Sequence, residues 1–89
     1  MIKNINFFKI LFVLKNRNSY INTGDLAGEA KINYKNISKY LTSLEEKGFI
    51  ERDVYQEGKI RFIFNSLTLK GENYDIPSFY ELILKKNYL

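Results

Sequence analysis

Residues 25–52, which read DLAGEAKINYKNISKYLTSLEEKGFIER, constrain the fold more than any other part of the chain. Their apolar spacing predicts a short helix, a tight turn and a longer helix in which Ile37, Leu41 and Leu44 follow the i, i+4, i+7 rule of a buried face. Gly48 stands where a helix commonly ends in the left-handed conformation. Beyond it the apolar period changes from 3.6 to 2, which indicates strands. Two helices and a hairpin are therefore expected.

Polar residues predict where these helices begin, because a side-chain oxygen can accept the free N–H groups of a first helical turn. Asn22 or Thr23 can cap the shorter helix, and Asn33 can cap the longer one, which we expect over about residues 33–47. In the turn between them, Ile32 is expected to enter the core between the two helices.

The second half of the chain alternates apolar and polar residues and then returns to helical spacing. Residues 50–67 predict two strands joined by a turn at residues 56–59. Thr68 can cap a short helix, and Pro77 is suited to the first turn of a last helix over about residues 77–88.

The first predicted helix, about residues 4–16, is apolar over more than half of its circumference, whereas a surface helix has an apolar stripe of roughly 100°. It is either a central helix wrapped by its own domain or part of a subunit interface. We favour the interface, since so short a chain has few elements to wrap a helix. With the last helix, the expected dimer interface comprises Phe7, Phe8, Leu11, Phe79, Leu82 and Ile83.

The composition excludes several classes of function. Cysteine and histidine are both absent, so disulfides and metal sites with thiolate or imidazole ligands are impossible. The ten carboxylates are scattered, mostly beside lysines, and no glycine-rich loop could hold a phosphate. We therefore expect a protein that is not an enzyme and that uses neither a cofactor nor a metal.

Charge and hydropathy bear on the partners and the compartment. The net charge of +4, with eleven lysines and three arginines, suits a polyanionic partner. The apolar stretch at residues 2–14 resembles a signal-peptide core, but Asn4, Asn6 and Lys9 interrupt it, and it is shorter than the roughly 20 residues that span a bilayer. We expect a cytoplasmic protein with no membrane partner.

The spacing of these residues resembles that of the winged helix-turn-helix regulators. The matching positions are Leu26-Ala27, Ile32, Ile37-Ser38, Leu41, Leu44-Glu45, Gly48, Ile50 and Arg52. The segment Leu67-Thr68-Leu69-Lys70-Gly71 resembles the passage from wing to last helix in MarR-like and PadR-like proteins. The resemblance implies an α+β winged-helix fold of order α-β-α-α-β-β-α, in one domain over residues 1–89, with a C-terminal dimerisation helix.

The same resemblance implies a homodimeric transcription regulator that binds double-stranded DNA. This chain is much shorter than full-length MarR-type proteins and resembles more closely the minimal winged-helix regulators of archaea and their viruses. Its length leaves little room for a ligand pocket between the dimerisation and DNA-binding regions, so small-molecule induction is not expected.

The polar face of the helix at residues 33–47 suits a DNA major groove. Lys35 and Lys39 can neutralise phosphates or reach guanine edges, and Asn36 can pair with adenine. The expected DNA contacts, including the wing, are Tyr34, Lys35, Asn36, Ser38, Lys39, Thr42, Ser43, Lys59 and Arg61. Arg52 at the base of the wing could join them, although an ion pair with Asp53 or a glutamate is the interpretation that we favour.

Two other functions fit the same fold. A winged helix can serve as a protein–protein interaction module, or it can coat DNA without sequence preference. Interaction modules keep the packing residues and lose the basic face, whereas Lys35 and Lys39 are both present here. The sequence therefore favours a DNA-binding regulator.

Overall fold

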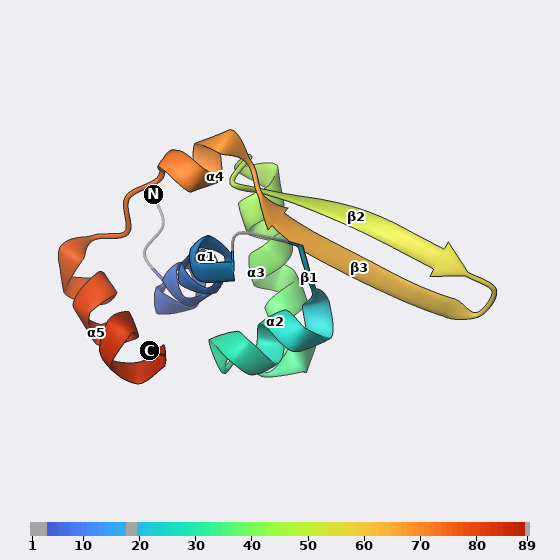
Figure 1. Cartoon of the computed structure of the whole chain (residues 1–89), viewed down its shortest axis with the longest axis horizontal. Helices are drawn as coiled ribbons and strands as arrows, with labels where there is room; N and C mark the ends of the chain where they lie inside the picture. Colours follow the sequence, from blue (N-terminus) through green and yellow to red (C-terminus); the bar gives the residue numbers. More distant parts are fainter. Residues whose placement is uncertain (1–3, 18–19, 89) are drawn as a thin grey trace.

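The computed structural model of the protein describes residues 4–17 and 20–88. The elements are α1 (Ile5–Arg17), β1 (Ile21–Asn22), α2 (Thr23–Ala30), α3 (Tyr34–Glu46), β2 (Ile50–Glu57), β3 (Ile60–Leu67), α4 (Leu69–Asn73) and α5 (Ser78–Tyr88). Their order confirms the predicted α+β winged-helix fold, and α4 is the short helix that Thr68 caps (Figure 1).

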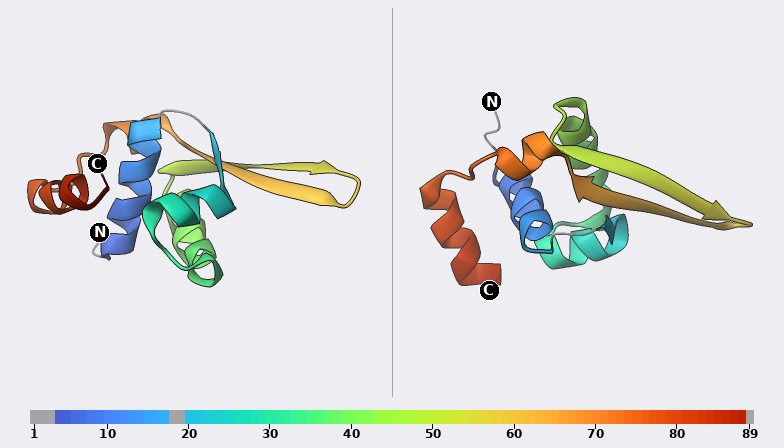
Figure 2. Two further views of the ribbon diagram at one scale, coloured as in Figure 1. Left: turned by 60° about the horizontal axis from the view of Figure 1, so that its bottom comes forward. Right: turned by 45° about the horizontal axis from the view of Figure 1, so that its top comes forward.

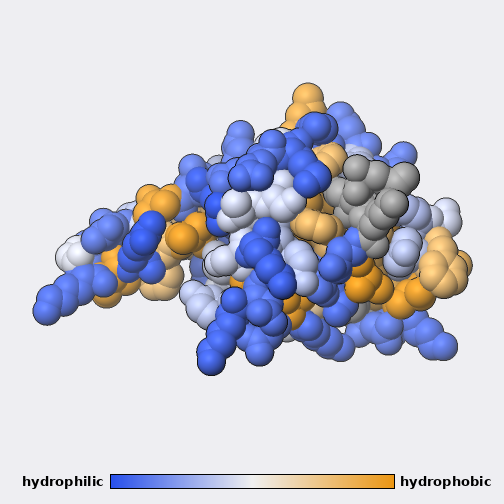
Figure 3. All heavy atoms as spheres, turned by 180° about the vertical axis from the view of Figure 1, so that it is seen from behind, coloured by the Kyte–Doolittle hydropathy of each residue, from blue (hydrophilic) through white to orange (hydrophobic). Residues whose placement is uncertain are grey.

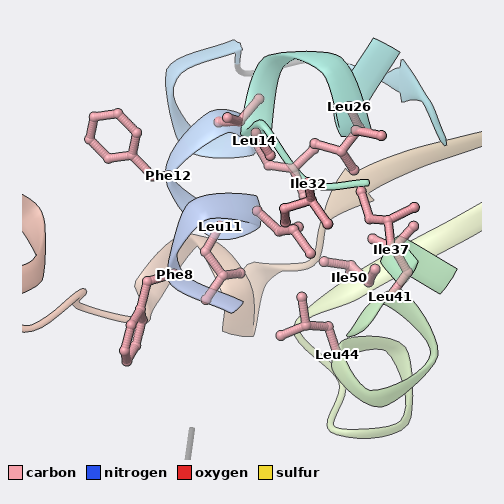
Figure 4. Packing of buried hydrophobic residues seen from close by; sticks show 14 of the residues in the cluster. Phe8, Leu11, Phe12, Leu14, Leu26, Ile32, Ile37, Leu41, Leu44 and Ile50 are labelled. Atoms are coloured by element: carbon pink, nitrogen blue, oxygen red, sulfur yellow. The ribbon is translucent and has the colours of Figure 1, made fainter. Parts of the chain in front are cut away.

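The first helix is covered by other elements of the same chain. α1 lies in the middle of the helical part, with α5 on one side and α2 and α3 on the other (Figure 1). The side chains of Phe8, Leu11 and Leu14 are at most 1% exposed. Phe8 points away from Leu26 and Ile37 (Figure 4), and its ring lies 4.6 Å from that of Tyr80 on α5. Neighbouring elements of the same chain therefore explain the apolar circumference of α1, and no subunit interface is needed to account for it.

The helix-turn-helix is built by the local signals that its sequence carries. Asn22 accepts a hydrogen bond from the backbone N–H of Asp25 at 2.8 Å, and Asn33 accepts one from that of Lys35 at 2.8 Å. Ile32 in the turn is 8% exposed and belongs to the core, as predicted (Figure 4). The two helices are thus held at a defined crossing by their caps and by one buried side chain.

The three strands form an antiparallel sheet in the order β1-β3-β2. Residues 50–57 pair with residues 60–67 along their whole length, from Ile50 opposite Leu67 to Glu57 opposite Ile60. This hairpin projects beyond the helices as a long wing, in a molecule with a longest dimension of 44 Å (Figures 1 and 2). Gly58 in its turn has φ of +61°, a conformation that favours glycine.

The end of α3 is tied to the segment that follows the wing. The backbone carbonyls of Lys47, Gly48 and Phe49 accept hydrogen bonds, respectively, from the Lys70 ammonium at 2.7 Å, from the Thr68 hydroxyl and from the Thr68 backbone N–H at 3.1 Å. We call this arrangement the carbonyl junction. It closes the base of the wing and joins α3 to the start of α4.

None of the helices within the described part of the chain is long and apolar enough to cross a membrane.

Candidate nucleic-acid interface

One face of α3 is buried and the opposite face is open to solvent. Ile37, Leu41 and Leu44 are each 0% exposed. The expected DNA-contact residues of this helix lie away from them: Tyr34, Lys35, Asn36, Ser38, Lys39 and Thr42 are exposed, and Ser43 is partly buried. The fold therefore presents the polar side chains of α3 together on one accessible surface.

The two lysines of this surface keep their charge uncompensated. Within the described residues, neither Lys35 nor Lys39 lies in an ion pair with a carboxylate. The Lys39 ammonium lies 5.1 Å from the centre of the Tyr40 ring, and that ring packs edge-to-face on Phe7 with 5.4 Å between centroids. Lys39 thus packs on the Tyr40 ring, which itself packs on Phe7, and the positive charge of Lys39 remains available to an anion.

A hollow of about 240 Å³ lies where α3, the wing and the start of α2 meet. Its lining residues are Asn22, Thr23, Gly24, Tyr34, Ser38, Arg52, Arg61, Phe62 and Ile63. It brings together Tyr34 and Ser38 from α3 and Arg61 from β3, three residues predicted as DNA contacts. The positive end of the α2 dipole is at the same place, which adds to the attraction for an anion.

Arg52 lines this hollow but has a partner. Its guanidinium donates to the Glu45 carboxylate at 2.8 Å and to the Thr42 hydroxyl at 3.4 Å. This confirms the structural ion pair that the sequence favoured, with Glu45 and not Asp53 as the acid. Arg61 has no ion-pair partner among the described residues, so it supplies the free positive charge of the hollow.

Asn65 has a role that the sequence did not reveal. It is 0% exposed, and its amide donates to the carbonyl of Ile21 and to the hydroxyl of Thr23, both at 3.1 Å. The Thr23 hydroxyl donates in turn to the carbonyl of Ile63 at 3.3 Å. These bonds hold the root of β3 against β1 and the start of α2, which sets the width of the hollow. The sequence feature that could have indicated this role is an asparagine within a strand of alternating apolar and polar residues.

Lys59 is apart from the other predicted DNA contacts. It lies in the turn at the far end of the wing, well away from α3 (Figure 1). Beside it, the Tyr55 hydroxyl donates to the Glu57 carboxylate at 2.8 Å. This hydrogen bond to a negative group raises the pKa of Tyr55, with a smaller contribution from desolvation. The wing tip thus carries both a cation and an anion.

The predicted dimer residues fall into two groups. Phe8 and Leu11 lie in the core of the protomer itself, at 1% and 0% exposure, so this structure leaves neither side chain for a second copy. In contrast, Phe79 and Leu82 on α5 are each 70% exposed, and Ile83 is partly buried. Among these predicted dimer residues the uncovered apolar side chains are therefore on α5, and Phe7 is turned towards Tyr40 of α3.

Two hollows lie between α5 and the rest of the chain. One open hollow of about 630 Å³ lies between α1, α2 and α5, with Phe12, Arg17 and Lys86 in its lining. Another of about 420 Å³ lies between α1, the segment before α5 and α5 itself, and it also reaches Phe12. Both hollows are open to solvent, and the expectation that small-molecule induction is absent stays a prediction.

The sequence of the chain matches the profile of the MarR family over residues 3–54, which is more than half of its length. The chain belongs to the MarR family. Proteins of this family are transcription regulators that bind DNA, and they are not enzymes. The family match covers α1, the helix-turn-helix and the first part of the wing. The narrower resemblance to minimal regulators of archaea and their viruses stays a prediction.

Several solved structures have a similar fold. NadR in complex with 4-hydroxyphenylacetate is 27% identical, with a TM-score of 0.66, and the match covers 98% of this chain and 58% of NadR. The Staphylococcus aureus regulator MepR has 20% identity and a TM-score of 0.63, over 97% of this chain and 60% of MepR.

Reduced AbfR bound to DNA has 18% identity and a TM-score of 0.64, over 90% of this chain and 56% of AbfR. At such identities MepR and AbfR support the fold alone. This chain spans less than two thirds of the length of each of these structures. Among protein sequences with curated descriptions, none matches the chain.

Proposed function

We propose that this MarR-family chain is a homodimeric regulator that binds double-stranded DNA with α3 in the major groove. One observation carries the proposal: α3 and the wing share one basic, accessible surface. The uncompensated Lys35 and Lys39 lie on α3, and the hollow beside it contains the unpaired Arg61. Lysine and arginine side chains gathered on one accessible surface suit a phosphate backbone.

The side chains of α3 divide by what they offer to DNA. The major groove admits an α-helix, and base edges there are read by hydrogen bonds. Asn36 offers the paired donor and acceptor that suit adenine, while Lys35 and Lys39 offer donors for phosphates or guanine edges. Tyr34, at the start of α3 and 64% exposed, offers a hydroxyl and a ring at the end that enters the groove first.

The hollow suits a backbone phosphate next to that groove. Arg61 would supply the charge, and the hydroxyls of Ser38 and Tyr34 would supply hydrogen bonds. Arg52 would act indirectly, because Glu45 already holds its guanidinium against α3. Lys59 at the wing tip would reach phosphates or the adjacent minor groove.

The dimer would form through α5 and not through α1. Phe79 and Leu82 are the large apolar side chains of α5 that remain most open to solvent, and Ile83 borders them. Pairing of α5 with its copy would remove this apolar area from water. Two copies of α3 could then enter successive major grooves about 34 Å apart on one face of the duplex.

Fluorescence anisotropy with labelled duplexes tests the proposal, and selection from a random duplex pool tests its specificity. We expect binding to a mixed-sequence duplex that weakens steeply as salt is raised, and enrichment of a palindromic sequence in the selection. Binding without enrichment would favour a general DNA-coating protein. Failure to bind any duplex at low salt would overturn the proposal in favour of a protein–protein interaction module.

A further inference from the structure

The strand register divides the side chains of the wing between two faces, because residues paired across an antiparallel ladder point to the same side of the sheet. The inner face begins with Ile50 and Asn65, which are buried against the helices. The outer face carries the other set: Glu51, Asp53, Tyr55 and Glu57 from β2, and Ile60, Phe62, Phe64 and Ser66 from β3. We call this second set the outer wing face.

The outer wing face is apolar and uncovered at its centre. Tyr55 is 52% exposed, its cross-strand partner Phe62 is 43% exposed, and Ile60 is 58% exposed. The rings of Phe62 and Phe64 lie 6.1 Å apart, so the apolar stripe is continuous along β3. Apolar residues are visible among hydrophilic ones on the projecting wing (Figure 3). The solvated face of an antiparallel sheet is ordinarily polar, so this stripe is unusual.

The charges on this face are all negative. Glu51, Asp53 and Glu57 are exposed, and none of them forms an ion pair within the described part of the chain. The strand register assigns no lysine or arginine to the same face. This contrasts with the inner face, which carries Arg52 and Arg61, and with the net charge of +4 for the whole chain. A duplex is thus attracted to one side of the wing and repelled by the other.

We propose that the outer wing face binds a segment of another protein that presents apolar side chains flanked by lysine or arginine. The aromatic stripe supplies contact area for the apolar residues, and charge complementarity with three carboxylates selects the basic flanks. Two copies of this face repel each other, and so does an anionic lipid surface. Phe62 is the one member of the outer wing face that also lines the hollow proposed for DNA, and the inference does not depend on DNA binding.

The probe for this surface is a short labelled peptide of alternating phenylalanine and lysine, compared with a peptide in which each lysine is replaced by glutamate. The chain is basic overall, so a basic peptide has no general reason to bind it. We expect the basic peptide to bind in fluorescence anisotropy and the acidic one not to bind. The variant E51Q/D53N/E57Q should weaken binding and reduce its dependence on salt.

Substitutions on the two faces of the wing locate the site. Tyr55→Ser and Ile60→Ser should each weaken binding of the basic peptide by about tenfold, as expected for the loss of an important apolar contact. Val54→Ser is the matched control, because Val54 is 56% exposed and points to the inner face. Phe62 is not substituted, since it also lines the hollow beside α3. Duplex binding serves as a separate readout that these outer-face substitutions should leave unchanged.

Three results would overturn the inference. Equal binding of the basic and acidic peptides would remove the role of the carboxylates. An equal loss of peptide binding in Val54→Ser and in Tyr55→Ser would show that the outer wing face is not the binding site. Self-association in sedimentation that Tyr55→Ser abolishes would make a second copy the occupant of the face.

Discussion

The Arg52 guanidinium on β2 donates to the Glu45 carboxylate on α3 at 2.8 Å, and so joins the base of the wing to the helix proposed to read DNA. The two side chains are 21% and 40% exposed, which makes the pair partly shielded and not an isolated surface contact. The position of this ion pair, between β2 and α3, suits it to orienting the wing more than to stabilising the fold.

Breaking this pair should affect DNA binding more than stability. Arg52→Ala and Glu45→Ala should each lower the free energy of unfolding by about 1 kcal/mol or less. Both should also weaken duplex binding, because each releases the wing from α3. Comparison of the two variants distinguishes a role of Arg52 in positioning the wing from a direct contact of Arg52 with DNA. If Arg52 touched DNA directly, Glu45→Ala would free its charge and strengthen binding instead.

The lysines of α3 should account for part of the salt dependence of duplex binding. Lys35→Ala and Lys39→Ala should each weaken binding and reduce the slope of log affinity against log salt by about one counterion. Lys86→Ala on α5 is the control, since that helix lies on the far side of α1 from α3 (Figure 1). Unchanged binding in both α3 variants would place the DNA interface elsewhere.

The oligomeric state should depend on the exposed side chains of α5. Leu82→Asp should give a monomer in sedimentation at micromolar concentration, because it places a charge in the proposed apolar interface. Leu69→Asp on α4 is closely matched, as Leu69 is 73% exposed and Leu82 is 70% exposed. A dimer that survives Leu82→Asp, or is equally disrupted by Leu69→Asp, would contradict the assignment to α5.

Gly71 should be intolerant of any side chain. A Cβ at this position would overlap the carbonyl oxygen of Phe49, a backbone atom that is held by the carbonyl junction. Gly71→Ala should therefore lower the free energy of unfolding by roughly 1–3 kcal/mol, as overpacking does. A Cβ added at Gly28 in α2 meets nothing within 4 Å. Gly28→Ala should therefore raise the free energy of unfolding by up to about 1 kcal/mol, because alanine has the higher helix propensity. Urea titrations would measure both.

The ionisation of Tyr55 should respond to Glu57. The carboxylate accepts the phenol hydrogen and opposes a negative phenolate, so the pKa lies above its ordinary value. Glu57→Gln should lower the pKa towards that ordinary value, seen in ultraviolet titration as the difference between each protein and its Tyr55→Phe form. The stabilising hydrogen bond is fully present below the ordinary pKa and is lost as the pH rises through the raised one. An unchanged titration would contradict the contact.

The helix-turn-helix could be predicted because its signals are local. Asn22 and Asn33 cap the helices that follow them, Ile32 fills the turn, and Gly48 takes φ of +81° after the end of α3. Each of these depends on residues within a few positions along the chain. The wing was predictable for a related reason, since alternation specifies a strand once a turn residue such as Gly58 is present.

The role of α1 could not be predicted in the same way. Its apolar circumference describes what must be covered but not which elements cover it, and that depends on the packing of α2, α3 and α5 around it. The candidate site divides similarly. The exposed face of α3 follows from helical periodicity. The hollow depends instead on the packing that places Arg61 of β3 and Ser38 of α3 in one lining, and on the bonds of the buried Asn65.

The carbonyl junction also has a consequence for the length of any operator. Lys47, Gly48 and Phe49 at the end of α3 are bonded to Thr68 and Lys70, only a few residues before α5 begins. In a dimer joined through α5, each copy of α3 would be linked to the symmetry axis through this connection and through α1, which packs on both α3 and α5. The number of base pairs between half-sites would then depend in part on residues 68–77, and mutations there could change this spacing without changing the bases that α3 prefers.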